Sequence, residues 1–193
     1  SDELVSLLAD VDNLFIITCN KCFKEFETID EPECGELEKL VTEQGKKVTG
    51  TARVDFLCNS TQTEKKLQDM IPEGTEHILV ASCGLGIQTV AALAGRPVYA
   101  ASNSLNYTGH HGMALTKKSC DACAQCYLNV TGGICPIVNC SKSLVNGQCG
   151  GAKNGKCEVD PDKDCAWEKI YKRLEKQGRL SEFLDQPVQL RDY

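Results

Sequence analysis

The sequence lacks the features that mark a membrane protein or a nucleic-acid-binding protein. It has no apolar run near the roughly 18 residues that a membrane span needs, and residues 1–12 are acidic, without the basic start of a signal peptide. Lysine and arginine are scattered, and the net charge of -6 disfavours a phosphate-backbone partner. These absences predict a soluble, cytoplasmic protein with no membrane span and no nucleic-acid partner.

A constellation for chemistry on a substrate is also missing. No nucleophile–base pair and no pair of carboxylates stands out, and no internal repeat is visible. The chain has only 3 histidines, and we expect none of them to bind metal, because thiolates outnumber them. This pattern favours a subunit that is not itself catalytic.

Apolar side chains are scarce between Cys120 and Cys165, where cysteines are abundant. Leu, Ile, Val and Phe together number 8 in these 46 residues, against 29 in the first 101. A share below roughly 20% is typical of chains that do not build a core. The same stretch holds 8 of the 13 cysteines. Thiolates on a metal or cluster can supply the missing folding free energy, so we expect a metal-ordered, irregular region here.

A secreted disulfide scaffold is the alternative that a cysteine-rich chain invites. The odd cysteine count, the length of the chain and its ordinary first half disfavour this alternative. Four Asn-x-Ser/Thr sequons nevertheless keep it open, at Asn59, Asn106, Asn129 and Asn139.

The first hundred residues alternate strand-like and helix-like patterns. This alternation predicts an α/β fold with a parallel sheet, Rossmann-like or flavodoxin-like, over residues 1–101, followed by a cysteine-rich region over 102–193. The apolar helical face of residues 166–178 predicts an amphipathic helix, and residues 180–193 resemble a tail or docking strap. The predicted strands are 14–19, 53–58, 77–82 and 98–101, and the predicted helices are 35–44, 63–71 and 86–93.

Five cysteines are predicted to meet at one edge of this sheet, because ligands in open α/β sheets bind beyond the carboxyl ends of the strands. We expect four of the five to hold a cluster, with the fifth buried. A thioredoxin-like pair, Cys19-x-x-Cys22, is the alternative, but it would leave three cysteines without a role. Cys19, Cys58 and Cys83 close predicted strands, Cys22 lies in the first loop, and Cys34 precedes the first predicted helix.

The most specific local signal is Cys120-x-x-Cys123-x-x-Cys126 with a later Cys135-Pro136. This spacing is typical of ferredoxin-type proteins that hold a [4Fe–4S] cluster, although the gap to Cys135 is longer than in a ferredoxin. Zinc is the alternative, since the same thiolates suit a tetrahedral site.

Four further cysteines follow at even spacing. Zinc ribbons usually present paired C-x-x-C knuckles, which these four lack. A second cluster and a zinc ion both fit, and the division of the last eight cysteines stays open. The four are Cys140, Cys149, Cys157 and Cys165.

Gly84-Leu85-Gly86 opens a predicted helix after a strand, where backbone N–H groups can hold a phosphate such as that of a flavin. Gly84 and Gly86 are therefore candidate cofactor-binding residues. The full G-x-G-x-x-G pattern is absent, which favours a packing role in a tight turn.

Several of these motifs together carry a family resemblance. They are GGICPIVNCSKSLVNGQCGG, GKCEVD and DCAWEKIYKRLEKQG between residues 132 and 178, with CDACAQC, ASCGLG and CNKC further upstream. In these motifs the chain resembles the cysteine-rich C-terminal family of methylenetetrahydrofolate reductase. Gln148 is a departure, since proline is expected before the CGG, but no thiolate is lost.

The resemblance implies a small subunit, or a fused domain, of the reductase of acetogenic bacteria. Such a subunit is expected to hold two or more [4Fe–4S] clusters or zinc, and to dock on the flavin-containing catalytic subunit. It would pass electrons from ferredoxin or another carrier to the partner's FMN in Wood–Ljungdahl one-carbon metabolism. A second flavin on this chain is a further expectation.

Overall fold

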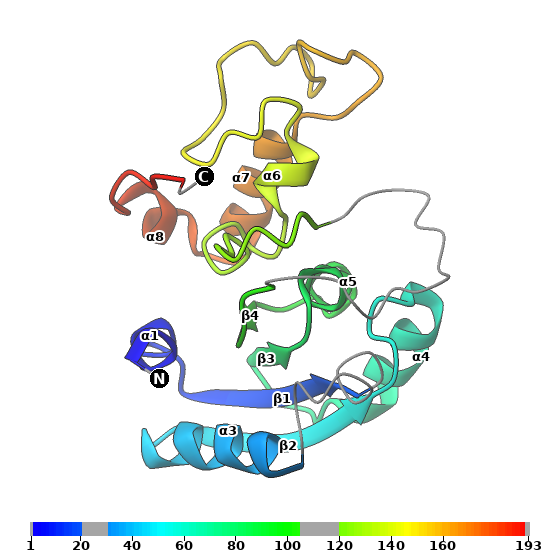
Figure 1. Ribbon diagram of the computed structural model, residues 1–193, viewed down its shortest axis with the longest axis vertical. Helices are drawn as coiled ribbons and strands as arrows, with labels where there is room; N and C mark the ends of the chain where they lie inside the picture. Colours follow the sequence, from blue (N-terminus) through cyan, green and yellow to red (C-terminus); the bar gives the residue numbers. More distant parts are fainter. Residues whose placement is uncertain (1, 21–30, 105–119, 192–193) are drawn as a thin grey trace.

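The computed structural model describes residues 2–20, 31–104 and 120–191, and it gives no side-chain positions for Asp2 and residues 31–34. Four parallel strands form one sheet, with helices on both faces (Figure 1). The strands are β1 (Asn13–Cys19), β2 (Lys47–Val54), β3 (His77–Ala81) and β4 (Val98–Ala100). The helices are α1 (Asp2–Leu7), α3 (Glu31–Glu43), α4 (Ser60–Met70), α5 (Gly84–Leu93), α6 (Pro136–Asn139), α7 (Ala166–Lys176) and α8 (Leu180–Leu184).

The strand order is β2-β1-β3-β4, with parallel pairing throughout. This order is that of flavodoxin-like sheets, in which the strand order reverses between β1 and β3 and ligands bind at that point. In the register of the central pair, Phe15 lies opposite Ile78 and Ile17 opposite Val80. The predicted α/β fold with a parallel sheet is therefore confirmed.

Alternate residues of β1 enter two separate cores, because side chains of a strand point to opposite faces. Phe15 and Ile17 pack with residues of α4 and α5, whereas Leu14 and Ile16 pack with residues of α1 and α3. Burial on both faces explains why β1 reads as a continuous apolar run.

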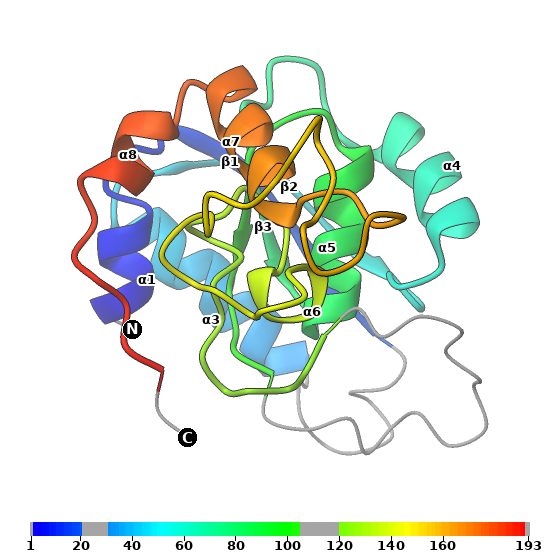
Figure 2. The same cartoon turned by 90° about the horizontal axis from the view of Figure 1, so that it is seen from above.

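The cysteine-rich region covers the α5 face of the sheet (Figures 1 and 2). Tyr127, Leu128 and Ile137 belong to the same apolar cluster as the inward residues of β1 and β3. Arg173 of α7 donates from Nη1 to the carbonyl oxygen of Ala91 in α5 at 2.7 Å. The two predicted regions thus share a core, and the boundary at residue 101 stays a prediction.

The C-terminal helix α7 is amphipathic, as predicted. Trp167, Ile170 and Leu174 are buried on one face and form a third apolar cluster. Gly178, just beyond the helix, has a φ of 69°, a left-handed conformation that glycine adopts without strain.

Three sequence predictions of element bounds were wrong or incomplete. The strand predicted over 53–58 overlaps the observed one only at Arg53 and Val54: β2 runs from Lys47 to Val54, and residues 55–58 form a turn in which Phe56 has a φ of 53°. Helix α3 begins at Glu31 and not at residue 35, so Cys34 lies inside its first turn. Helices α1 and α8 were not predicted. No helix in the described ranges has the length and apolar character to span a bilayer.

Candidate metal centre

Two cysteines follow or end the strands β1 and β3, between which the strand order reverses. Cys19 is the last residue of β1 and is 6% exposed, and Cys83 is the N-cap residue of α5, directly after β3. Burial raises the pKa of Cys83, and the nearby thiols of Cys19 and Cys120 raise it further. Both cysteines therefore lie at the carboxyl edge of the sheet, and their role as ligands stays a prediction.

Cys120 joins this pair from the cysteine-rich region. A Cβ atom built on Gly84, the first residue of α5, would lie 2.6 Å from Cys120 Sγ and 3.3 Å from its Cβ. Such a separation is well inside van der Waals contact, so only glycine at position 84 lets Cys120 approach the helix. The backbone N–H of Gly84 donates a hydrogen bond to the hydroxyl oxygen of Ser104 at 2.8 Å.

The CDACAQC segment and Cys135 bring four cysteines to one pocket. Its cavity volume is 20 Å³, room for about one water molecule. Burial raises the pKa of Cys126 to about 11, and nearby Cys135, Cys120 and Cys123 raise it further. The structure thus brings together the four thiols that the sequence pattern selected.

Backbone N–H groups point at the sulfur atoms of several cysteines. Burial raises the pKa of Cys135, while N–H groups of Val138 and Ile137 act in the opposite direction. The N–H groups of Gly86 and Leu85 act likewise on Cys83. Hydrogen bonds of this kind favour the thiolate form, which is the form that binds metals.

The backbone between these cysteines adopts a strained conformation. Ala122 has a φ of 49° and Ala124 a φ of 59°, in the left-handed region that residues other than glycine rarely occupy. Turns of this type gather backbone N–H groups into concave sites for anions, including iron–sulfur clusters. Such strain is typical of functional loops.

Four polar residues that sequence reasoning missed hold the segment in place. Gln88 of α5 accepts the N–H of Cys135 through Oε1 at 3.2 Å, and donates to the carbonyl of Gly84 at 3.0 Å. Asn103 accepts the N–H of Cys126 at 3.1 Å. Gln88 is one of only two polar side chains in the apolar helix α5, which is the only signal that could have marked it. The third and fourth of these polar residues are Ser104, which accepts the N–H of Gly84, and Asn129, which accepts the N–H of Ala100.

Asn129 pairs with the free edge of β4. Its side chain accepts the N–H of Ala100 at 2.6 Å and donates to the carbonyl of the same residue at 3.3 Å. The amide therefore replaces a neighbouring strand. This sequon asparagine is engaged in the fold, as is Asn139, which donates to the carbonyl of Cys135 at 2.9 Å.

The last four cysteines are strung along the loops between α6 and α7. The Cys157 thiol contacts the Ser141 hydroxyl, next to Cys140, at 3.5 Å. The Cys149 thiol donates to Glu158, next to Cys157, at 3.2 Å. Ser141 and Glu158 are each next to a cysteine in sequence, so the two contacts bring Cys140, Cys149 and Cys157 into one region of the fold.

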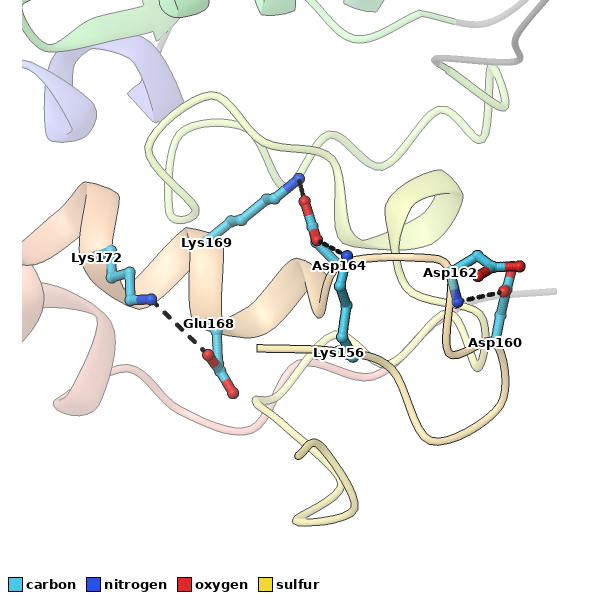
Figure 3. Close-up of polar contacts among 7 residues, drawn as sticks. All are labelled: Lys156, Asp160, Asp162, Asp164, Glu168, Lys169 and Lys172. Carbon is cyan, nitrogen blue, oxygen red and sulfur yellow. Dashed lines mark hydrogen bonds and ion pairs between the residues drawn. The ribbon is translucent and has the colours of Figure 1, made fainter. Parts of the chain in front are cut away.

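Ion pairs connect the end of this region to α7 (Figure 3). Asp164 accepts from Lys156 and from Lys169, each at 2.7 Å (Figure 3). These hydrogen bonds lower the pKa of Asp164 to about 2. Lys156 precedes Cys157 and Asp164 precedes Cys165, so the segments that carry the last two cysteines run side by side in antiparallel directions. Cys140 and Cys165 both pack against the Trp167 cluster.

Three candidate cysteines remain from the first half of the chain. Cys58 lies in the turn after β2 instead of at a strand end. Cys22 and the side chain of Cys34 lie outside the described residues. Cys19 is buried, whereas a thioredoxin-like nucleophile is accessible to solvent, which disfavours that alternative. None of the eleven cysteines with described side chains forms a disulfide.

The described residues contain no group of three or more Cys, His, Asp or Glu side chains arranged to hold a metal ion as they stand. The thiols converge without adopting a coordination geometry. The chemistry of the donor set and the N–H groups directed at sulfur fit a thiolate-bound metal or cluster. Metal binding itself stays a prediction, as does the flavin at Gly84 and Gly86.

Comparison with known proteins adds a family assignment. Residues 99–193 match the family described as methylene-tetrahydrofolate reductase C terminal. No curated protein and no solved structure matches the chain. The match includes the last eight cysteines, three of which lie in CDACAQC. Cys19, Cys58 and Cys83 lie outside it. The C-terminal half of this chain, residues 99–193, belongs to the methylene-tetrahydrofolate reductase C-terminal family.

Proposed function

We propose that this chain is an iron–sulfur electron-transfer and docking component of a methylene-tetrahydrofolate reductase, which passes electrons to the flavin of the catalytic polypeptide. The observation that carries the proposal is the convergence of Cys120, Cys123, Cys126 and Cys135 on one pocket. The family assignment supports the association with a reductase.

The chain's own residues would hold and tune such a centre. Bound there, an iron–sulfur cluster supplies one-electron transfer at a potential that hydrogen bonds and burial adjust. The N–H groups directed at Cys83, Cys126 and Cys135 would stabilise the thiolates. Gln88 and Asn103 would fix the loops that carry the ligands.

The second group of cysteines supports a structural role. Cys140 and Cys165 pack on the Trp167 cluster, and the ion pairs of Asp164 attach their loop to α7. A metal at this group, zinc or a second cluster, would fasten α7 to the rest of the chain. A zinc-binding adaptor without electron transfer is therefore the second candidate function.

Anaerobic purification followed by iron, sulfide and zinc analysis tests the proposal. We expect a brown protein with absorption near about 400 nm that bleaches with dithionite, and about four iron atoms for each cluster. Cys126→Ser should remove the iron of the first site alone, and Cys149→Ser should affect only the second. Gln68→Ala, on the exposed surface of α4, is the control.

Two results would contradict the proposal. Stoichiometric zinc without iron would favour the structural adaptor. A folded, colourless, metal-free chain that still binds the reductase polypeptide would exclude both candidate functions, because the thiols would then bind neither a cluster nor zinc.

A further inference from the structure

Helix α5 provides one wall of the cysteine pocket, although this helix lies outside the residues that match the reductase family. The pocket is the one that Cys120, Cys123, Cys126 and Cys135 share. Gly84 and Gln88 also line it, and their spacing of four residues places them one helical turn apart on the same face of α5. The family match begins at residue 99, so it covers the four cysteines but not this wall. The pocket therefore joins two parts of the chain.

The side chain of Gln88 connects these two parts. Its Oε1 accepts the N–H of Cys135 at 3.2 Å, and its Nε2 donates to the carbonyl oxygen of Gly84 at 3.0 Å. Gly84 is the residue against which Cys120 packs. One amide thus fixes the backbone of Cys135 relative to the place where Cys120 contacts α5. Methionine has about the length of glutamine but only a weak acceptor, and asparagine is one methylene shorter, so neither can make both bonds.

The position of Cys135 affects the charge on its sulfur. Cys135 is the N-cap residue of α6, and burial raises the pKa of its thiol while the N–H groups of Val138 and Ile137 act in the opposite direction. These N–H groups keep their direction only while the backbone at Cys135 stays in place. Hydrogen bonds to the sulfur atoms of a cluster shift its reduction potential, and they favour the reduced form because it carries more negative charge. Gln88 therefore acts on this sulfur through the backbone of Cys135.

We propose that Gln88 is a positioning residue, which raises the reduction potential of a cluster in the cysteine pocket by holding Cys135 in place. This inference rests on the proposed function, because it takes the bound group to be an iron–sulfur cluster. An amide with a purely structural role would stabilise the fold and leave the potential unchanged. A positioning residue changes the potential at an unchanged iron content.

Asn103 offers a comparison within the same site. Its Oδ1 accepts the N–H of Cys126 at 3.1 Å, which is the same kind of contact that Gln88 makes with Cys135. Asn103 is exposed, so a water molecule can replace its oxygen when the side chain is removed. Gln88 is partly buried in the wall of the pocket. The contact of Gln88 should therefore have the larger effect on the potential.

A redox titration of the whole, anaerobically purified chain, followed by electron paramagnetic resonance, tests the proposal. The signal that disappears in Cys126→Ser identifies the cluster of the cysteine pocket. Gln88→Met removes both hydrogen bonds, and the ratio of reduced to oxidised cluster at the parent's midpoint should fall about 3- to 10-fold. For a one-electron couple this is a shift of about 30–60 mV to lower potential, at 59 mV for each tenfold change. The iron and sulfide content of the chain should not change.

Thr89→Ala is the matched control. Thr89 follows Gln88 in α5 and donates to the carbonyl of Leu85 at 2.9 Å, but it does not line the pocket. This variant loses a hydrogen bond of the same helix, so its stability can fall while its midpoint stays that of the parent. Asn103→Ala should change the ratio by less than about 3-fold. If Gln88→Met does not fold, Gln88→Asn decides, because its amide stays polar but is too short to reach Cys135.

Three results would overturn this inference alone. The first is an unchanged midpoint in Gln88→Met or Gln88→Asn when both the parent and the variant hold the cluster. The second is a shift in Thr89→Ala as large as that in Gln88→Met, which would trace the effect to a general loosening of α5. The third is loss of the cluster from both Gln88 variants, because Gln88 would then determine assembly and not potential. A parent chain with no iron that Cys126→Ser removes would overturn the proposed function together with this inference.

Discussion

Replacing Gly84 by alanine tests the packing of Cys120 against α5. The added Cβ would lie 2.6 Å from Cys120 Sγ, where ordinary contacts are about 3.5–4.0 Å, so one of the two groups must move by about 1 Å. Overpacking of this size costs about 1–3 kcal/mol. Alanine gains at most about 1 kcal/mol in helix propensity, and less at the first helical position. We therefore expect Gly84→Ala to lower the free energy of unfolding by about 1–2 kcal/mol.

Gly35→Ala is the matched control. Gly35 lies in α3, is exposed, and has no heavy atom within 4 Å of the position of an added Cβ. Only the helix propensity changes there, so this variant should be about 0.5–1 kcal/mol more stable than the parent chain. Guanidinium unfolding of both variants under reducing, anaerobic conditions measures the difference. If Gly84→Ala proved as stable as Gly35→Ala, the close approach of Cys120 to α5 would be wrong.

Three further predictions concern the segments around the cysteines. Asn129→Ala leaves the N–H of Ala100 without a partner, so urea unfolding should show a loss of about 1–3 kcal/mol; an unchanged midpoint would exclude this role. Ala124→Gly relieves a left-handed conformation and should be neutral or stabilise by up to about 1 kcal/mol, whereas Ala124→Val should destabilise the chain; the opposite order in thermal unfolding would contradict it. Burial raises the pKa of Tyr99, despite Arg179 beside it, and Glu182 and Asp10 raise it further, while the ring of His77 packs against it. The folded state then holds the phenol proton more tightly than the unfolded state, so the free energy of unfolding falls as pH rises past about 10. Between about pH 8 and pH 11, Tyr99→Phe should therefore lose less stability than the parent chain. Equal losses in the two proteins would refute the assignment.

The fold of the first half could be predicted because its signals are local. Buried parallel strands such as β1 and β3 are continuous apolar runs, and the helices between them show regular spacing. Strand β2 was placed wrongly because it is an edge strand with a largely polar sequence, in which only Val54 is fully buried. The apolar residues after it, Phe56 and Leu57, belong to the turn that follows.

The candidate site could be predicted only in part. Strand ends and C-x-x-C spacing identify Cys19, Cys83 and Cys120, since both rules depend on neighbours in sequence. The contacts of Gln88 with Cys135 and of Asn129 with Ala100 join residues 47 and 29 positions apart. No local pattern marks such pairs.

X-ray absorption at the iron and zinc edges of the anaerobically purified chain tests the central claim most directly. Metal–sulfur distances of about 2.3 Å arise for zinc thiolates and iron–sulfur clusters alike, whereas a shell of neighbouring iron atoms arises only from a cluster. The account predicts an iron edge with both shells, and loss of part of that signal in Cys126→Ser. A zinc edge with sulfur ligands alone, or a folded chain with neither an iron nor a zinc edge, would contradict it.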